Sequence, residues 1–126
     1  ELFGAVVVQV PLLDMKRYSH LLAGASWMAE YGNPDTADWS YIQTFSPYHL
    51  FDAKKDYPAT LFTTSTKDDR VHPGHARKMM ALMETAGKDV RYYENIEGGH
   101  GGAANNAQSA HMNALSYTFL WQQLSK

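Results

Sequence analysis

Three apolar runs suited to β-strands recur along the chain, and segments with helical spacing separate them. The runs are Gly4–Val10, Pro58–Ser65 and Val90–Ile96. The first is almost continuously β-branched, which is typical of a strand buried on both faces of a parallel sheet. Strand–helix–strand–helix order with short connections predicts an α/β fold of three mainly parallel strands with right-handed crossovers and flanking helices.

Two long helices have recognisable boundaries. Pro73 suits the first turn of a helix that follows the second strand, and Gly87 suits its end. A last helix is predicted from about Asn105 to Leu124. Its predicted buried stripe consists of Ala107, Ala110, Ala114, Tyr117, Trp121 and Leu124. Residues 12–50 are irregular and aromatic-rich, with weak helical patterns over 12–22 and 36–45.

The number of predicted strands is small for a sheet. Sheets usually have roughly five or six strands, and the first strand here would present an unpaired hydrophobic edge. The chain also opens almost directly into a strand, with neither an initiating methionine nor a leader. We therefore expect it to be part of a larger domain, whose other strands lie upstream or in another chain.

Composition excludes several classes of function. The 126 residues suffice for one domain or part of one, and the net charge of −2 gives no electrostatic reason to bind nucleic acid or an anionic membrane. No apolar run approaches the roughly 20 residues that span a bilayer. The chain has no cysteine, which excludes disulfides and thiolate metal sites. The compartment stays open between cytoplasm and periplasm.

Two loops carry the residues best suited to chemistry. Asp68 and Asp69 follow the second predicted strand, and His100 follows the third within Glu97–Gly102. The carboxyl ends of parallel strands meet at one edge of a sheet, so we expect these loops to be neighbours. A carboxylate there can orient the histidine ring and stabilise its imidazolium. An acid followed by a histidine, in this order, is how an α/β-hydrolase supplies two members of a Ser-His-Asp triad.

The nucleophile of such a triad is missing from the sequence. No Gly-x-Ser-x-Gly motif occurs in the 126 residues. Among the serines of the chain, Ser26 comes nearest to the nucleophile motif, because Gly24 lies two positions before it. The second glycine is absent, however, and no buried strand precedes Ser26, so a strained nucleophile turn is not indicated.

The same segments resemble the prolyl oligopeptidase family of serine peptidases. The acid and histidine segments match over 68–79 and 97–102. Further matches are Gly4–Val7, Val10–Met15, Trp27–Gly32, Tyr41, Ser46–Tyr48 and Tyr117–Trp121. Members of this family pair an N-terminal β-propeller with a C-terminal α/β-hydrolase domain. The resemblance implies that residues 1–126 are a partial catalytic domain, without the nucleophile motif and without any propeller.

The resemblance also implies roles for individual residues. Asp68 matches the triad acid and His100 the general base, which leaves Asp69 as a structural residue. Arg70 falls where prolyl endopeptidases place an arginine that grips a substrate carbonyl; a solvated side chain or an ion pair with Asp69 is the alternative. Trp27 and Tyr31 fall in a segment that helps to line the pocket for a substrate proline, with core packing as the alternative. Neither the serine nor the oxyanion tyrosine of the family has a counterpart here.

No cofactor is implied. His72 and His75 lie three residues apart, which raises the question of a metal site, but no third ligand is evident.

Two hypotheses follow. The first is a segment of a serine peptidase that supplies Asp68 and His100 for hydrolysis of peptides after proline and is inactive alone. The second is a non-catalytic module that forms homo-oligomers through the exposed sheet edge. A small esterase that uses one of the chain's own serines is a third and weaker alternative. The sequence does not distinguish whether the intact enzyme acts as an endopeptidase, an exopeptidase or an esterase.

Overall fold

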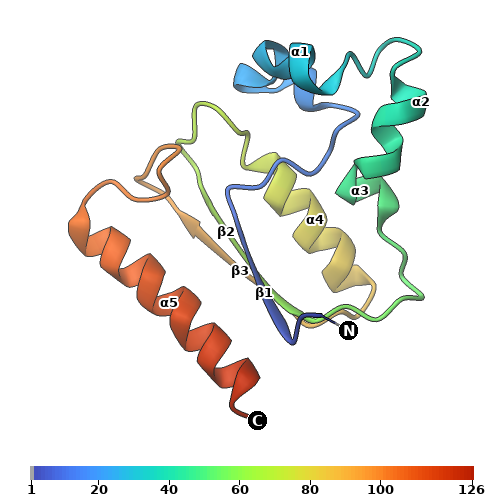
Figure 1. Cartoon of the computed structure of the whole chain (residues 1–126). Helices are drawn as coiled ribbons and strands as arrows, with labels where there is room; N and C mark the ends of the chain where they lie inside the picture. Colours follow the sequence, from blue (N-terminus) through green and yellow to red (C-terminus); the bar gives the residue numbers. More distant parts are fainter. Residues whose placement is uncertain (1) are drawn as a thin grey trace.

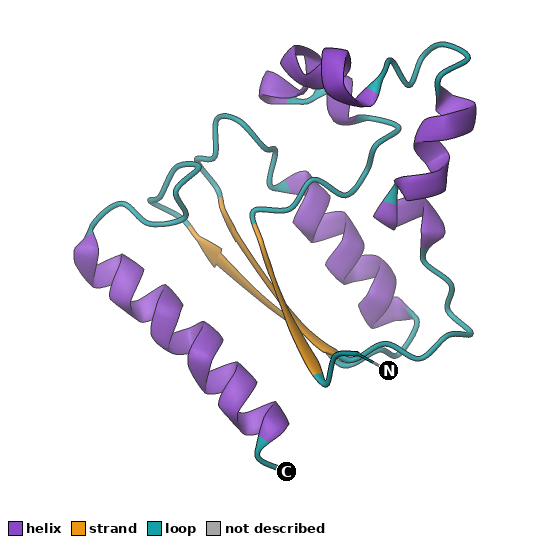
Figure 2. Cartoon of the chain, in the orientation of Figure 1, coloured by secondary structure: helices purple, strands orange, loops and turns teal. Residues whose placement is uncertain are grey.

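Residues 2–126 are described by a computed structural model in which helices cover both faces of a three-stranded sheet (Figures 1 and 2). The strands β1 (Ala5–Gln9), β2 (Ala59–Ser65) and β3 (Val90–Asn95) are parallel and lie in the order β1-β2-β3. The predicted parallel α/β fold is confirmed. Each strand begins and ends within one residue of its predicted bounds.

Helix α4 (Gly74–Thr85) connects β2 to β3 and covers one face of the sheet. Its Met79 and Met83 pack on Phe62 of β2 and on Leu13, and all four side chains are buried. Burial of one such side chain stabilises the fold by roughly 1.5–3 kcal/mol. The predicted helix end is also confirmed, because Gly87 has a φ of +72° just beyond α4.

Helix α5 (Asn106–Leu124) covers the opposite face and has the predicted extent. The Asn105 side chain caps it by accepting the N–H of Gln108. The predicted buried stripe is wrong. Tyr117, Trp121 and Leu124 are 72%, 75% and 62% exposed, and the three alanines of the stripe are exposed as well. The helix instead buries Ser116 and Phe119 against the sheet. Helical spacing cannot select between two apolar faces of one helix, so the packing of the sheet decided which face is buried.

Residues 10–58 connect β1 to β2 through short helices only. These are η1 (Tyr18–His20), η2 (Leu22–Trp27), α1 (Met28–Tyr31), α2 (Trp39–Ile42), η3 (Gln43–Phe45) and α3 (Pro47–Leu50). The helical pattern over 36–45 corresponds to α2 and η3. Of the pattern over 12–22, only Tyr18–His20 forms a short helix, η1. The carbonyl of Leu13, which an α-helix would pair with the N–H of residue 17, instead accepts the N–H of Tyr48 at 3.1 Å. Side chains of His75 and Ser46 bind the backbone N–H groups of residues 13–15.

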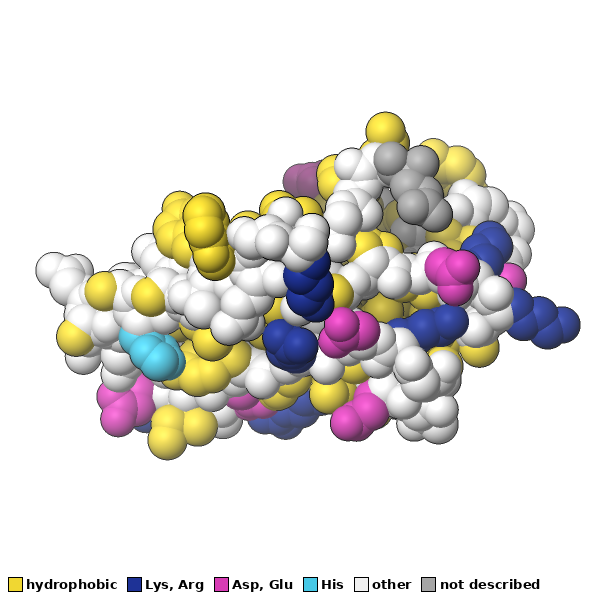
Figure 3. Space-filling model, turned by 90° about the horizontal axis from the view of Figure 1, so that it is seen from below, with side chains coloured by type: hydrophobic (Ala, Val, Ile, Leu, Met, Phe, Trp, Pro, Cys, Tyr) yellow, Lys and Arg dark blue, Asp and Glu magenta, His cyan; other side chains and the backbone are white. Residues whose placement is uncertain are grey.

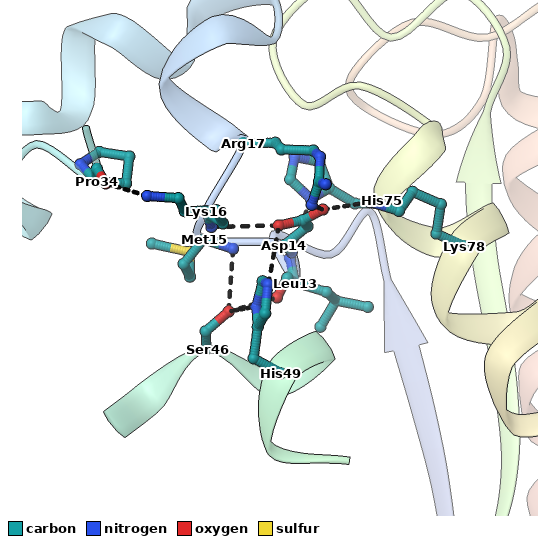
Figure 4. A network of polar contacts seen from close by, with 10 residues as sticks. All are labelled: Leu13, Asp14, Met15, Lys16, Arg17, Pro34, Ser46, His49, His75 and Lys78. Atoms are coloured by element: carbon teal, nitrogen blue, oxygen red, sulfur yellow. Dashed lines mark hydrogen bonds and ion pairs between the residues drawn. The ribbon is translucent and has the colours of Figure 1, made fainter. Parts of the chain in front are cut away.

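A buried polar network provides those side chains (Figure 4). His75, at the start of α4, is 2% exposed. Its Nδ1 accepts the N–H groups of Leu13 and Asp14, at 3.3 and 3.0 Å, so the ring is neutral. Burial lowers the pKa of His75 to about 4. The hydroxyl oxygen of Ser46 accepts the N–H of the next residue, Met15, at 3.1 Å. The chain is therefore held in an irregular path where it leaves β1.

The carboxylate of Asp14 is the charged centre of this network. It is 1% exposed and forms ion pairs with Lys78 of α4 and with Arg17, the second at 3.2 Å. Burial opposes ionisation of Asp14, but the hydrogen bond and the charge of Lys78, together with Arg17, outweigh it and lower the pKa of Asp14. Burial also lowers the pKa of His49, which contacts Ser46.

The surface carries mixed charge. In the view of Figure 3, basic and acidic side chains lie among hydrophobic ones, and neither sign of charge dominates that face. Across residues 2–126, no helix combines the length and the apolar character that a membrane crossing requires.

Candidate active site

Asp68 lies in the loop that follows β2, and its carboxylate is oriented by backbone groups. The residue is 4% exposed. Its Oδ1 accepts the N–H groups of Arg70 and Val71, both at 2.9 Å. This short-range turn is typical of aspartate, whose side chain readily binds backbone N–H groups nearby. The carboxylate is thereby held in one orientation at the carboxyl end of β2.

His100 lies in the loop that follows β3 and contacts the same carboxylate. Its Nδ1 is 3.0 Å from Oδ2 of Asp68 and 3.1 Å from Oδ1. An ionised carboxylate only accepts hydrogen bonds, so Nδ1 carries the proton and Nε2 carries the free lone pair. The Asp68 side chain is fully buried and the His100 side chain is 38% exposed. The arrangement therefore presents an oriented base at the surface of the chain.

Asp69 and Arg70 extend from the same loop toward solvent. Both residues are exposed, and within residues 2–126 neither side chain forms an ion pair. The alternative of an Asp69–Arg70 ion pair therefore has no support in this structure. The exposed guanidinium of Arg70 is free to bind an anion or a carbonyl oxygen.

Trp27 and Tyr31 lie in the connection between β1 and β2, on η2 and α1. Trp27 is partly buried against a cluster that contains Tyr18, which is fully buried. Tyr31 is 38% exposed and packs edge-on against Tyr18, with ring centroids 5.8 Å apart. Ala23 of η2 donates its N–H to the carbonyl of Arg70 at 3.3 Å. That hydrogen bond attaches the aromatic segment directly to the loop of Asp68.

A hollow of about 160 Å³ lies beside His100. Its wall is formed by the end of β1, by β2, by the loop of His100 and by the first turns of α5. The lining includes Val10, Thr63, Gly101, Gly102 and Met112. Val10 has a φ of +40°, which a β-branched residue rarely adopts. Such strain persists where surrounding structure imposes it, and it is often found next to functional sites. His100 is itself one of the residues that line the hollow.

The remaining histidines of this region have structural partners. His72 Nδ1 accepts the N–H of Gly74 at 2.8 Å, and His75 Nδ1 accepts two backbone N–H groups. Within residues 2–126, no group of three His, Asp or Glu side chains is arranged to hold a metal ion. Sequence reasoning did not foresee the role of His75 at the exit of β1; its only signal was a histidine at the start of a helix.

Comparison with known proteins matches the whole chain. A family profile described as the Prolyl oligopeptidase family matches residues 1–126. An uncharacterized peptidase of Sinorhizobium fredii is 53% identical over 125 residues, which cover 98% of this chain and 17% of that protein. A prolyl endopeptidase of Elizabethkingia miricola is 34% identical over 115 residues, or 87% of this chain and 16% of that protein.

Solved structures give the same result. A post-proline cleaving enzyme from Rickettsia typhi superposes with a TM-score of 0.89 at 36% identity, over 99% of this chain and 18% of that protein. One of two prolyl endopeptidases studied for inter-domain dynamics superposes with a TM-score of 0.90 at 40% identity. The superposition covers 98% of this chain and 19% of that protein. The chain thus spans about a sixth of the length of the curated relatives that it matches.

Proposed function

Because the chain belongs to the prolyl oligopeptidase family, we propose that Asp68 and His100 are two members of a Ser-His-Asp triad that hydrolyses peptide bonds after proline. The homologues are peptidases, and the fold corresponds to the C-terminal part of their α/β-hydrolase catalytic domain. The observation that carries the proposal is the contact between His100 Nδ1 and the buried Asp68 carboxylate at 3.0 Å.

The serine of this triad lies outside the 126 residues in our proposal. Its Oγ attacks the carbonyl carbon of the scissile bond, and Nε2 of His100 takes its proton. The imidazolium then gives that proton to the leaving amine, while Asp68 holds the ring and stabilises its charge. Water repeats the sequence on the acyl-enzyme and restores the serine.

The other residues predicted from the sequence have supporting roles in this proposal. The exposed Arg70 guanidinium binds a carbonyl oxygen of the peptide backbone. Trp27 and Tyr31 contribute aromatic surface to the proline pocket, since flat apolar rings suit a pyrrolidine ring. Their support is that η2 is hydrogen-bonded to the backbone of Arg70. Endopeptidase and exopeptidase activity both fit this arrangement.

Labelling with a fluorophosphonate, followed by intact-mass analysis, tests the proposal. The complete peptidase that contains this chain should gain one adduct, at a serine outside residues 1–126. It should also cleave a reporter peptide with proline before the scissile bond, but not a matched peptide with alanine there. The 126-residue chain alone should show no mass shift, because the nucleophile of the proposed triad lies outside it. An adduct on a serine of the chain itself would instead favour a small esterase.

A second candidate function is self-association of the chain, and two observations favour it. Within residues 2–126, the outer edge of β1 pairs with no strand. The exposed side chains of Tyr117, Trp121 and Leu124 lie on α5, which packs against β1. An open strand edge next to exposed aromatic surface is a usual site of pairing between chains.

We expect the isolated chain to form dimers or larger species in sedimentation velocity at micromolar concentration. Tyr117→Lys should shift the distribution toward monomer, because it places a charge on the aromatic face of α5. Tyr41→Lys is the matched control, since Tyr41 is 70% exposed and Tyr117 is 72% exposed. A monomer throughout the concentration range would remove self-association as a candidate function.

A further inference from the structure

The loop that carries His100 contains four glycines, so its order needs an explanation. Gly98, Gly99, Gly101 and Gly102 surround the histidine. Glycine loses more conformational freedom on ordering than any other residue, so holding four glycines in one conformation has a large entropic cost. Without external attachments, this loop would not hold the His100 ring on the Asp68 carboxylate before substrate arrives.

The turn that contains His100 is closed on itself. Gly102 has a φ of +85° and donates its N–H to the carbonyl of Gly99 at 2.9 Å. Gly98 lies so close to this turn that a side chain there would approach the Gly102 carbonyl oxygen to 2.7 Å. The four residues 99–102 therefore form one compact turn. The position of this turn depends on the hydrogen bonds that join its ends to neighbouring elements.

Ser65 attaches this turn to the strand that carries the acid. It is the last residue of β2, three positions before Asp68, and it is completely buried. Its hydroxyl donates a hydrogen bond to the carbonyl of Gly102 at 3.0 Å. The carbonyl of Ser65 accepts the N–H of Asp68 at 3.3 Å. One residue thus contacts both the acid loop and the histidine turn.

A second attachment closes the base of the histidine loop. Oδ1 of Asn95 accepts the N–H groups of Glu97 and Gly98, at 2.9 and 2.8 Å. The Asn95 amide also donates to Oε1 of Gln108 at 2.9 Å. Gln108, on the first turn of α5, accepts the N–H of Ala104 at 2.8 Å and donates to Glu97 at 2.6 Å. Both ends of the loop are therefore joined through one glutamine.

We propose that Ser65, supported by the Asn95–Gln108 pair, is a positioning residue of the peptidase that fixes His100 against Asp68. This inference rests on the proposed function, because it assigns Ser65 an effect on catalysis through His100. Ordering the loop in advance means that the general base does not have to be ordered during the reaction, and small displacements of such a group are costly in rate.

The test is Ser65→Ala in the complete peptidase, with Ser116→Ala as the matched control. Ser116 is also a buried serine, but its hydroxyl has no hydrogen-bond partner within residues 2–126. Both variants lose one buried hydroxyl, and only Ser65→Ala loses a hydrogen bond. We expect Ser65→Ala to lower kcat about 10-fold per fluorophosphonate-titrated site with KM within about twofold, because the lost interaction acts on the chemical step. Ser116→Ala should match the wild type.

Normalisation to titrated sites separates positioning from a loss of folded enzyme, which lowers the number of sites and leaves the rate per site unchanged. A second readout is the downfield proton resonance of the Nδ1–H bond between His100 and Asp68. It should broaden or disappear in Ser65→Ala and persist in Ser116→Ala. Equal rates per site and equal resonances in the two variants overturn the proposal.

A second pair of variants decides the question if Ser65→Ala does not fold. Gln108→Met removes the amide that joins the loop ends and keeps the length of the side chain. Gln122→Met is its control, because Gln122 lies on the same helix and its amide makes no hydrogen bond within residues 2–126. The expected result is again a lower kcat per site for Gln108→Met alone. If the wild-type peptidase hydrolyses no peptide, the proposed function fails; an active peptidase with four wild-type-like variants contradicts only the positioning role.

Discussion

Asp68→Asn should lower kcat of the complete peptidase by about 10⁴-fold, the loss typical of this change in a serine-protease triad. The asparagine Oδ1 can keep the two backbone N–H bonds that Asp68 Oδ1 makes with Arg70 and Val71. Its NH₂ group would then face Nδ1 of His100 and could not accept a proton from it. The ring would turn or change tautomer, and Nε2 would no longer be the free base. Steady-state kinetics with a proline reporter peptide measure the effect.

Asp69→Asn is the matched control, since it makes the same chemical change one residue later. Asp69 is exposed, and its side chain forms no hydrogen bond or ion pair within residues 2–126. We expect kcat and KM to remain within about twofold of the wild type, as is usual for surface positions without partners. If Asp69→Asn is the variant that abolishes turnover, the assignment of the acid to Asp68 is wrong.

The 126-residue chain should lose about 3 kcal/mol of stability as the pH falls from above 6.5 to about 4. The buried His75 has a pKa of about 4 in the folded chain, against an ordinary value of 6.5. Between these values the unfolded chain binds more protons, so stability is present above pH 6.5 and is lost as the pH falls. The difference in pKa corresponds to about 3 kcal/mol. Urea unfolding at a series of pH values measures it.

His75→Asn provides the control for this effect. Asparagine has an acceptor oxygen in the place of Nδ1 and does not titrate, so it can still receive the N–H groups of Leu13 and Asp14. The variant should lose most of the slope between pH 6.5 and 4; His49, whose pKa burial also lowers, accounts for the remainder. An unchanged slope in His75→Asn would show that other groups cause the acid sensitivity.

Glu94 titrates mainly below the range of His75, and the two ranges overlap only between about pH 4.5 and 4. Its hydrogen bond with Arg77, together with those from Thr66 and Tyr92, lowers its pKa to about 2. The stability that Glu94 contributes is present above pH 4.5 and is lost as the pH falls toward 2. Lower pH therefore adds a second phase of destabilisation, which His75→Asn leaves unchanged.

Two sequence-based predictions about helices differ from the structure, and each difference has a physical cause. Helical spacing over residues 12–22 is genuine, but the carbonyl of Leu13 accepts the N–H of Tyr48, and His75 and Ser46 bind the backbone N–H groups of residues 13–15. His75 is about 60 residues away in sequence from the groups that it binds, and no local pattern reveals such a partner. The exposed face of α5 was missed for a related reason. Burial depends on what lies opposite a helix, and the spacing of residues along the helix carries no information about that.

The sequence by itself determined the parallel α/β fold, because β-branched runs and helical spacing are local properties of the chain. It also placed Asp68 and His100 after neighbouring strands, and parallel pairing brings such loops to one edge of a sheet. Only the tertiary structure decided how these loops are held. The hydrogen bonds of Ser65 to Gly102 and of His75 to Asp14 join residues 37 and 61 positions apart. Long-range contacts of this kind follow from packing in three dimensions and not from any periodicity of the sequence.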